Sequence, residues 1–565
     1  MTLRIANCSG FYGDRLSAAR EMVEGGPIDV LTGDWLAELT MLILAGNRLK
    51  GRPGYAPTFL RQLEEVLGTC LDRGIKIVSN AGGLDPAGCA EAIAALATRL
   101  GLSPKIAHVT GDDVQGRDRP WPNTETGEPL PRPALTANAY LGGRPIADAL
   151  TAGADVVVTG RVTDAALVTG PGMWRYGWRP DDYDALAGSV VAGHVIECGC
   201  QATGGNYAFF QEIPDLAHCG FPIAELHADG SSVITKHPGT GGRVSVGTVT
   251  AQLLYEIASP AYAGPDAVAH FDTISLSQEA EDRVAITGVT GSPPPDTLKV
   301  AVNYLAGYRN TMTLVVTGLD MEAKAAQAEA SIWARTPRET WAETHVSFVP
   351  PLLRITVMDQ DRDLAGRTFS SAVVETGLAS YPGFYGLNPP GAASPYGVYW
   401  PSAIPASEVS PVVWVDGVAL GTRREPDASA GSLVREPLGA PGRRDEVRRS
   451  PARPYGGPLV NGPLGHVLGA RSGDKGGNAN LGVWARDARH FPWLREFLTV
   501  ERLQELLPEL KAHRVDRYEL DNLSAVNFVI HGLLGRGVAA SPRLDAQAKA
   551  LGEELRAQYA DIPAG

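Results

Sequence analysis

Residues 75–100, IKIVSNAGGLDPAGCAEAIAALATRL, contain the unit that decides the fold of this chain. The short β-branched run predicts a buried strand, the following glycines predict a turn, and the alanine-rich stretch has the apolar spacing of a helix. Asp85 followed by Pro86 matches a helix start, with the aspartate as N-cap and the proline in the first turn. The stretch therefore predicts a strand, a turn and a helix in direct succession.

The same unit begins five times within the first 170 residues. Strands are predicted within residues 3–7, 28–34, 75–85, 105–113 and 154–164. Strands that alternate with helices pair in parallel, through right-handed crossovers, and are covered on both faces. We therefore expect residues 1–244 to form an α/β domain with a doubly wound, mostly parallel sheet.

The remaining chain changes character twice. Residues 245–420 mix predicted strands with a long alanine-rich helix at 321–335, which favours an α+β region. Residues 421–461 are rich in Arg, Pro, Gly and Ser and predict a flexible linker. Residues 462–565 predict two helices on one small sheet, for which a ferredoxin-like α+β domain is the simplest fold.

Composition excludes several classes of protein. Acidic residues outnumber basic ones by 63 to 50, a net charge of -13, which disfavours a nucleic-acid partner. The most apolar helical run, LAELTMLILAG at 36–46, is too short to span a membrane, and no signal-type core follows the N-terminus. The six scattered cysteines form no disulfide framework. We expect a cytoplasmic protein with no membrane or nucleic-acid partner.

Carboxylates follow several of the predicted parallel strands directly. In open α/β sheets, ligands bind at the carboxyl ends of the strands, so these side chains are candidates for one shared site. An aspartate before a helix is also an ordinary N-cap, and that alternative stays open for each of them. Arg161 lies in the same turns and offers a planar cation for a carboxylate or phosphate. The candidates are Asp34, Asp112 and Asp164 as acid or base, and Arg161 and Asn80 as substrate-binding residues.

Two glycine-rich turns precede predicted helices, SNAGGLDPAG at 79–88 and HPGTGGRVSVG at 237–247. Free backbone amides at such places favour an anion, and a simple turn is the alternative. Neither turn is a Walker A loop or a full dinucleotide fingerprint, which disfavours a nicotinamide oxidoreductase. The candidate binding residues in these turns are Gly82, Gly83, Lys236, His237, Gly241 and Gly242.

The stretch GHVIECGCQATGGNY, residues 193–207, raises the question of a metal or redox site. Structural zinc needs a second pair of ligands, and a redox pair usually has two residues between its cysteines. In an extended segment, Glu197 would face away from Cys198 and Cys200. We expect a strand and turn that line a substrate pocket, with Glu197 as acid or base and Thr203, Gly204 and Gly205 as binding residues.

The C-terminal region contains ARSGDKGGNANLG at 470–482, a loop with more glycines and more charges than a plain hairpin needs. Ligand or interface contact and a plain turn are the alternatives. The candidate binding residues are Arg471, Asp474 and Lys475.

Several ordered motifs carry a resemblance to a known family, among them IANCSGFYGDR, SNAGGLDP, TGRVTDAAL, GHVIECGCQATGGNY, KHPGTGGRVS and ARSGDKGGNANLGVWAR. The chain resembles the acyclic terpene utilisation (AtuA-like) family over residues 3–420 and 462–555. The resemblance implies a role in bacterial breakdown of branched or isoprenoid acids carried as coenzyme A thioesters, and a ferredoxin-fold module at the C-terminus. The arginine-rich linker looks like an insertion peculiar to this chain.

These observations favour a catabolic enzyme that acts on a branched or isoprenoid acyl-CoA, or a related acid, by lyase or hydro-lyase chemistry. Such chemistry needs an acid, a base and a cradle for an enolate. A hydrolase with Cys198 or a metal-held water as nucleophile, and a non-catalytic assembly subunit of an acyl-CoA carboxylase pathway, are the alternatives. We expect a small-molecule substrate, no cofactor beyond the coenzyme A of the substrate, and a homo-oligomer; the sequence leaves a divalent metal open.

Overall fold

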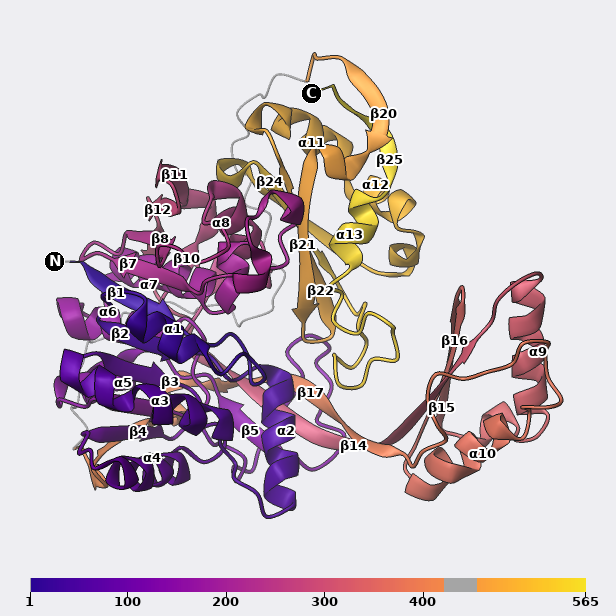
Figure 1. The fold of residues 1–565 in the computed structure, drawn as a ribbon, viewed down its shortest axis with the longest axis horizontal. Helices are drawn as coiled ribbons and strands as arrows, with labels where there is room; N and C mark the ends of the chain where they lie inside the picture. Colours follow the sequence, from indigo (N-terminus) through magenta and orange to yellow (C-terminus); the bar gives the residue numbers. More distant parts are fainter. Residues whose placement is uncertain (1, 421–454, 565) are drawn as a thin grey trace.

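The computed structural model describes residues 2–420 and 455–564, and its largest element is an eleven-stranded sheet (Figure 1). Five parallel strands form its middle in the order β1-β2-β3-β6-β4. They are β1 (Leu3–Asn7), β2 (Val30–Gly33), β3 (Lys76–Ser79), β6 (Val156–Thr159) and β4 (Ile106–Thr110). All five correspond to the strands expected from the repeated unit, so the predicted parallel layer is confirmed.

Antiparallel strands extend this sheet at both edges. One edge carries β7 (Pro222–Leu226), β8 (Ser232–Lys236), β12 (Arg283–Thr287) and β11 (Ser275–Ala280). The other edge carries β18 (Val412–Val415) and β19 (Val418–Ala419). Segments from residues 275–287 and 412–419 therefore complete a sheet that the first 244 residues begin.

Helices cover the sheet on both faces. Successive residues of a strand point to opposite sides, so each strand contributes to both cores. Ile77 faces α1 (Ala18–Glu24), α3 (Pro57–Arg73) and α4 (Pro86–Leu100), while its neighbour Val78 belongs to the opposite core. That opposite core contains α5 (Arg144–Thr151), α6 (Ala166–Tyr176) and α7 (Tyr183–Ile196). The doubly wound arrangement is confirmed. The N-terminus of α4 forms as its sequence predicts, since the Asp85 side chain accepts a hydrogen bond from the amide of Gly88 at 2.9 Å.

The prediction of a strand within residues 193–207 is wrong. Helix α7 continues to Ile196, and a short 3-10 turn follows at Gly199–Thr203. Every residue from Leu186 to Ile196 is buried, because the large sheet packs on one side of α7 while β10 (Val268–His270) and β13 (Thr290–Ser292) pack on another. A helix surrounded by protein is apolar all round and lacks the one-sided period by which sequence reveals a helix.

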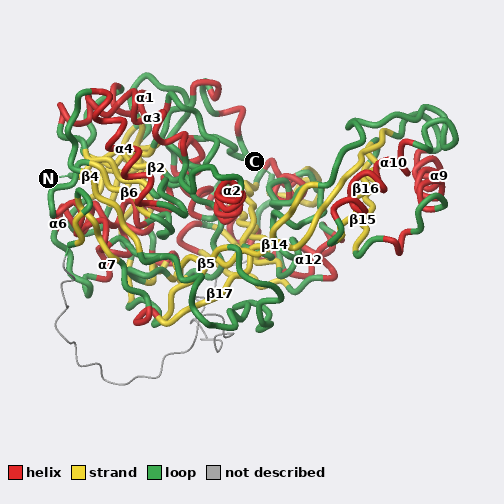
Figure 2. Tube along the Cα trace, turned by 90° about the horizontal axis from the view of Figure 1, so that it is seen from below, coloured by secondary structure: helices red, strands yellow, loops and turns green. Residues whose placement is uncertain are grey.

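A second sheet joins the body to a projecting arm (Figures 1 and 2). Its long strand β14 (Thr297–Val315) pairs with β5 (Thr136–Ala139) and β17 (Ser394–Pro405) at one end and with β16 (Leu352–Asp359) at the other. The arm also contains β15 (Glu343–Val349), α9 (Met321–Trp333) and α10 (Phe369–Val374) around its own apolar core. Three other elements contribute to the site described below: α2 (Glu38–Leu49), α8 (Val246–Leu253) and β9 (Ala261–Ala263).

The C-terminal domain has the predicted ferredoxin-like layout. Its sheet has the order β21-β22-β24-β23, made of β21 (Leu468–Lys475), β22 (Asn478–Ala485), β24 (Ala525–Ile530) and β23 (Val515–Leu520). The helices α11 (Phe491–Phe497), α12 (Val500–Leu506) and α13 (Leu551–Arg556) cover one face, and β20 (Leu459–Pro463) pairs with β25 (Tyr559–Pro563). Most of the predicted linker, residues 421–454, lies outside the described residues.

The other face of the C-terminal sheet docks onto the first half of the chain. Along β22, Ala479, Leu481 and Val483 belong to the core beneath the helices, and the residues between them face residues 254–258. Asn480 accepts a hydrogen bond from the amide of Glu256 at 2.8 Å. The period of two thus divides β22 into a core face and a docking face.

In residues 2–420 and 455–564, no helix is long and apolar enough to cross a membrane.

Gly482 tests the docked arrangement, because a Cβ there would lie 2.4 Å from Cβ of Leu254 and 2.9 Å from its carbonyl oxygen. We expect Gly482→Ala to cost about 1–3 kcal/mol of stability through overpacking and to speed hydrogen–deuterium exchange of residues 254–258. Gly456→Ala is the control, since its Cβ meets no atom within 4 Å. Unchanged exchange at 254–258 in Gly482→Ala contradicts the docked geometry.

Candidate functional site

Element ends from both halves of the chain meet at one group of charged and aromatic side chains. Asp34 follows β2, Asp164 lies beyond β6, Glu197 follows α7, and Lys475 ends β21. Their charges interact with one another, so they lie close together although the sequence separates them widely. We call this group the interdomain cluster. Its members are Asp34, Glu38, Tyr140, Arg161, Asp164, Glu197, Glu256, Tyr262, Lys299, Tyr399 and Lys475.

Arg161 is the most deeply buried cation of the cluster, with 2% of its surface exposed. Its guanidinium donates hydrogen bonds to a carboxylate oxygen of Asp164 at 3.1 Å and to the backbone carbonyl of Leu36, and its Cζ lies 4.2 Å from the ring centre of Tyr140. Both terminal nitrogens therefore bind the protein itself. In this geometry Arg161 holds Asp164 in place, and Asp164 keeps 31% of its side chain exposed.

Asp34 is buried beside Asp164. Burial and the nearby Asp164 charge raise the pKa of Asp34 well above its usual value, so this carboxyl keeps its proton to higher pH. One oxygen of Asp34 accepts hydrogen bonds from Asn80 Nδ2 at 2.6 Å and from the Leu36 amide at 3.0 Å. Asn80 also accepts a hydrogen bond from the amide of Trp35 at 2.8 Å, so it fixes the turn that carries Asp34.

Glu197 is the other carboxyl whose protonated form burial favours. Its exposed fraction is 8%, and burial, together with the charges of Asp164 and Glu256, raises the pKa of Glu197 well above its usual value. A protonated carboxyl of this kind can donate a proton to a reacting group. Glu197 can therefore act as an acid, and the Asp164 side chain that pairs with Arg161 lies near it.

His194 lies one turn before Glu197 on α7 and is fully buried. Burial and the charge of Lys475 lower the pKa of His194 to about 4, so its imidazole is neutral at neutral pH. Its Nδ1 lies 3.4 Å from Oε1 of Glu197, and the ring packs against Tyr262 and Phe271 at centre-to-centre distances of 5.3 and 5.5 Å. A neutral imidazole places no second charge beside Glu197.

Glu38 and Lys299 form an ion pair at the side of the cluster built by α2 and β14. Their closest atoms are 3.3 Å apart, and 31% and 42% of the two side chains are exposed. Although burial opposes it, Lys299 and Arg161 lower the pKa of Glu38 to about 2. Tyr140 donates a hydrogen bond to Glu38 at 3.1 Å. Lys299 is thus a cation of the cluster that solvent, and hence a ligand, can reach.

The C-terminal domain adds the tip of the hairpin formed by β21 and β22. Lys475 donates a hydrogen bond to the carbonyl of Glu256 at 2.7 Å, and its Nζ lies 5.4 Å from the ring centre of Tyr262. Burial and the charge of Lys299 lower the pKa of Lys475. Burial and Glu256 raise the pKa of the neighbouring Asp474 to about 7, with Lys549 3.8 Å away. The hairpin therefore contributes both charge signs to the site.

Asp112 lies behind the cluster. It is 3% exposed and accepts hydrogen bonds from Asn138 Nδ2 and from the Arg161 amide, each at 2.9 Å. Burial raises the pKa of Asp112 to about 6. A Cβ on Gly160 would lie 2.5 Å from this carboxyl, so the glycine makes room for it. Asp112 ties the ends of β4, β5 and β6 together.

The predicted glycine positions lie at close approaches between backbones. A Cβ on Gly82 would lie 2.5 Å from the Thr159 carbonyl, and Gly83 lies against Leu44 with φ +54°. Gly241 and Gly242 lie against the carbonyls of Asp215, His218 and Thr203.

The two charged or polar candidates beside the second glycine turn bind the protein itself. Lys236 pairs with Asp282 at 3.0 Å, and His237 contacts the Met22 carbonyl at 2.9 Å.

The turn after Glu197 packs under the C-terminal domain. Thr203 donates to the Gly220 carbonyl at 2.6 Å, Gly204 lies against Ile213, and Gly205 lies against the Cys200 carbonyl. Arg471 contacts this turn through Gln201 and through the carbonyl of Asn206, and its guanidinium lies 4.5 Å from the ring centre of Tyr255. Arg471 thus binds the first half of the chain.

Two observations bear on thiol and metal chemistry. Burial and the charge of Glu197 raise the pKa of Cys198 well above its usual value, which keeps it a thiol rather than a nucleophilic thiolate. Within residues 2–420 and 455–564, no group of three or more His, Cys, Asp or Glu side chains has the spacing to hold a metal ion.

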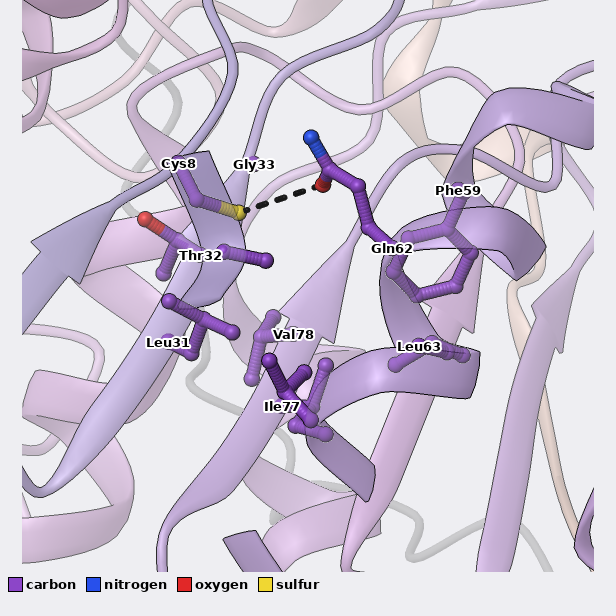
Figure 3. A pocket seen from close by; sticks show the side chains of 11 residues that line it. Cys8, Leu31, Thr32, Gly33, Phe59, Gln62, Leu63, Ile77 and Val78 are labelled. Carbon is purple, nitrogen blue, oxygen red and sulfur yellow. Dashed lines mark hydrogen bonds between the residues drawn. The ribbon is translucent and has the colours of Figure 1, made fainter. Parts of the chain in front are cut away.

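The enclosed cavity in Figure 3 lies elsewhere, between β1–β3 and α3. Its volume is about 10 Å³, its lining is almost entirely apolar, and its one polar contact joins Cys8 Sγ to Gln62 Oε1 at 3.6 Å. The cavity is too small for an organic ligand. An open hollow of about 450 Å³ lies on the arm between Arg335 and Arg367.

Sequence reasoning missed the residues that the second sheet brings to the cluster. Lys299 lies 261 positions from its partner Glu38, and no local pattern in β14 marks it. Tyr399 and Tyr262 come from β17 and β9 and had no signal of their own. Glu38 lay inside the apolar helical run at 36–46, and a charged residue within that run is the one signal that could have marked it.

Comparisons with known proteins identify two matches. A family model described as "Acyclic terpene utilisation family protein AtuA" matches residues 3–415, and one described as "AtuA ferredoxin-like domain" matches residues 463–560. No curated protein and no solved structure matches the chain. The first description associates this chain with the use of acyclic terpenes, and so with isoprenoid catabolism.

The opposite pKa shifts of Glu197 and Glu38 predict opposite effects of removing each charge. Below pH 4.5, the usual pKa of a glutamate, Glu197 is protonated in both the folded and the unfolded state, and as pH rises toward its folded pKa the wild type loses stability. A glutamine carries no such penalty. We expect Glu197→Gln to match the wild-type Tm near pH 4.5 and to exceed it increasingly as pH rises.

Glu38→Gln serves as the matched comparison. The folded pKa of about 2 means that Glu38 stabilises the fold above pH 4.5, and that this contribution fades as pH falls toward 2. Since the side chain is partly exposed, we expect a loss of about 1–2 kcal/mol at neutral pH that narrows in acid. Thermal melts across pH measure both variants; the same pH trend in both contradicts the assignment.

Proposed function

The chain belongs to the acyclic terpene utilisation family AtuA, and on that premise we propose that it is an enzyme that adds or removes water, or cleaves a carbon–carbon bond, beside the carbonyl of a branched isoprenoid acid or its coenzyme A thioester. The observation that carries the proposal is that two carboxyls of the cluster lie in different environments. Burial raises the pKa of Glu197 well above its usual value, while Asp164 is partly exposed and accepts a hydrogen bond from Arg161 at 3.1 Å. Two like groups in such different environments can divide the roles of acid and base.

In a dehydration, Asp164 takes the proton from the carbon beside the carbonyl, and the electron pair moves to form the double bond. Glu197 gives its proton to the departing hydroxyl, which leaves as water. The negative charge that develops on the carbonyl oxygen needs a cation, and Lys299 and Lys475 are the cations of the cluster whose ammonium groups are not locked to Asp164. Arg161 acts through Asp164 as a positioning residue.

The alternatives differ in which residue they need. A thiol hydrolase needs a reactive Cys198, whose raised pKa works against that role, and a metal hydrolase needs a metal-held water. A non-catalytic assembly subunit would use the open face of its C-terminal sheet to bind a partner. That face is covered by the protein's own residues 254–258, which favours a completed site within one chain.

We also propose a cytoplasmic homo-oligomer. All six cysteines are free thiols, as a reducing compartment would keep them. On the projecting arm, Leu319, Leu378 and Leu387 expose 83%, 105% and 61% of their surfaces, which supports contact with a second copy of the chain.

Light scattering should give a dimer or larger for the wild type and a smaller species for Leu378→Ser; a monomeric wild type contradicts the oligomer.

Turnover of branched 3-hydroxyacyl and 2-enoyl thioesters and free acids tests the reaction, with product and solvent-deuterium incorporation followed by mass spectrometry. We expect Asp164→Asn and Glu197→Gln each to lower kcat by about 10²–10⁴-fold, because each removes one proton-transfer group. Asp164→Asn should also abolish deuterium incorporation beside the carbonyl.

Cys198→Ser is the control variant and should keep its activity. Loss of turnover in Cys198→Ser supports a thiol hydrolase instead. Loss of turnover under a metal chelator, with Glu197→Gln as active as the wild type, supports a metal-dependent hydrolase. No turnover of any acid or thioester, with co-purification of a carboxylase, supports the assembly subunit.

A further inference from the structure

The hydroxyl of Tyr399 has no acceptor for its proton in the described part of the chain, and Lys299 is the side chain that interacts with its oxygen. Tyr399 is 8% exposed, and its hydroxyl oxygen is buried. Burial raises the pKa of Tyr399, so the hydroxyl remains a donor. A buried donor without an acceptor is costly, and a ligand that supplies the acceptor removes that cost.

Two lysines from different domains lie near Tyr399 and act on one another. Lys299 Nζ lies 5.6 Å from the ring centre of Tyr399. On the other side, the tip of the C-terminal hairpin touches the same ring, since a Cβ on Gly476 would lie 3.4 Å from Cε1 of Tyr399. Lys475, which precedes Gly476, has no carboxylate within 4 Å among the described residues.

The charges around the two lysines favour an anion between them. Glu38, 3.3 Å from Lys299, pairs with one cation, while Lys475 donates to the Glu256 carbonyl and has no carboxylate within 4 Å among the described residues. Glu256 and Glu125 are the other carboxyls whose charges act on Lys475, and burial raises the pKa of Glu125, Glu197 and Asp34. The two ammonium groups repel one another, and an anion between them relieves that repulsion.

We infer that Tyr399, Lys299 and Lys475 form a carboxylate-binding subsite shared by the two domains, and that it takes the free carboxylate of a branched isoprenoid acid. This inference rests on the proposed function and narrows it: the substrate enters as a free acid rather than as a thioester. A carboxylate has two oxygens, which can accept hydrogen bonds from the hydroxyl and from both ammonium groups. Because Lys475 belongs to the C-terminal domain, the subsite exists only when that domain is docked.

Calorimetric binding to the full chain tests the subsite without any need for turnover. The probes are 3-methylbut-2-enoate, its neutral amide and its coenzyme A thioester. We expect the acid to bind at least about tenfold more tightly than the amide, because hydrogen bonds to a charged carboxylate are stronger than those to a neutral amide. Lys299→Met and Lys475→Met should each weaken acid binding by about tenfold or more, and Tyr399→Phe by about 3–10-fold, with amide binding unchanged.

Lys324→Met, on α9 of the arm, is the matched control and should bind the acid as the wild type does. Equal binding of acid and amide by the wild type, or wild-type affinity in Lys475→Met, overturns the subsite. Since the comparison of acid with amide uses the unaltered protein, an unfolded variant does not obscure the result. If the acid binds but is not turned over, the subsite is supported and the proposed reaction is contradicted. If the thioester is turned over but the acid does not bind, the reaction is supported and the subsite is contradicted.

Discussion

The contact on which the site depends is the seating of the C-terminal sheet on residues 254–258. Asn480 accepts from the Glu256 amide at 2.8 Å, and Asn527 donates to the Ala258 carbonyl at 2.7 Å, so the sheet satisfies backbone groups that would otherwise lie unpaired in a closed interface. This seating places the hairpin tip beside Glu256, Tyr262 and Tyr399. Without it, Lys475 leaves the cluster.

Burial and nearby charges explain how one residue type takes opposite pKa shifts within one group. Glu197 and Asp34 lie where desolvation outweighs the nearby cations, and the pKa of each carboxyl is raised. Glu38, with Lys299 beside it, is ionised far into acid. Proximity to a cation, rather than chemical identity, decides which carboxyl serves as acid and which forms an ion pair.

The sequence predicted what local patterns control. The five parallel strands and the ferredoxin-like layout follow from short-range periods and turn residues, and the rim position of Asp34 and Asp164 follows from the parallel sheet. Helix α7 escaped because protein surrounds it and its period is hidden. Lys299 escaped because its partner Glu38 lies 261 positions away in the sequence, and Tyr399 because it meets Lys299 only through the pairing of β14 with β17; no local pattern records either contact.

The infrared difference spectrum between the wild type and Glu197→Gln at neutral pH tests the central claim most directly, because it reports the proton on Glu197 without any substrate. The account predicts that the wild type shows the carbonyl stretch of a protonated carboxyl, that Glu197→Gln loses it, and that Gly482→Ala, which disturbs the docking face, weakens it. A difference spectrum that contains only carboxylate bands would contradict the claim that burial in the interdomain cluster keeps this acid protonated.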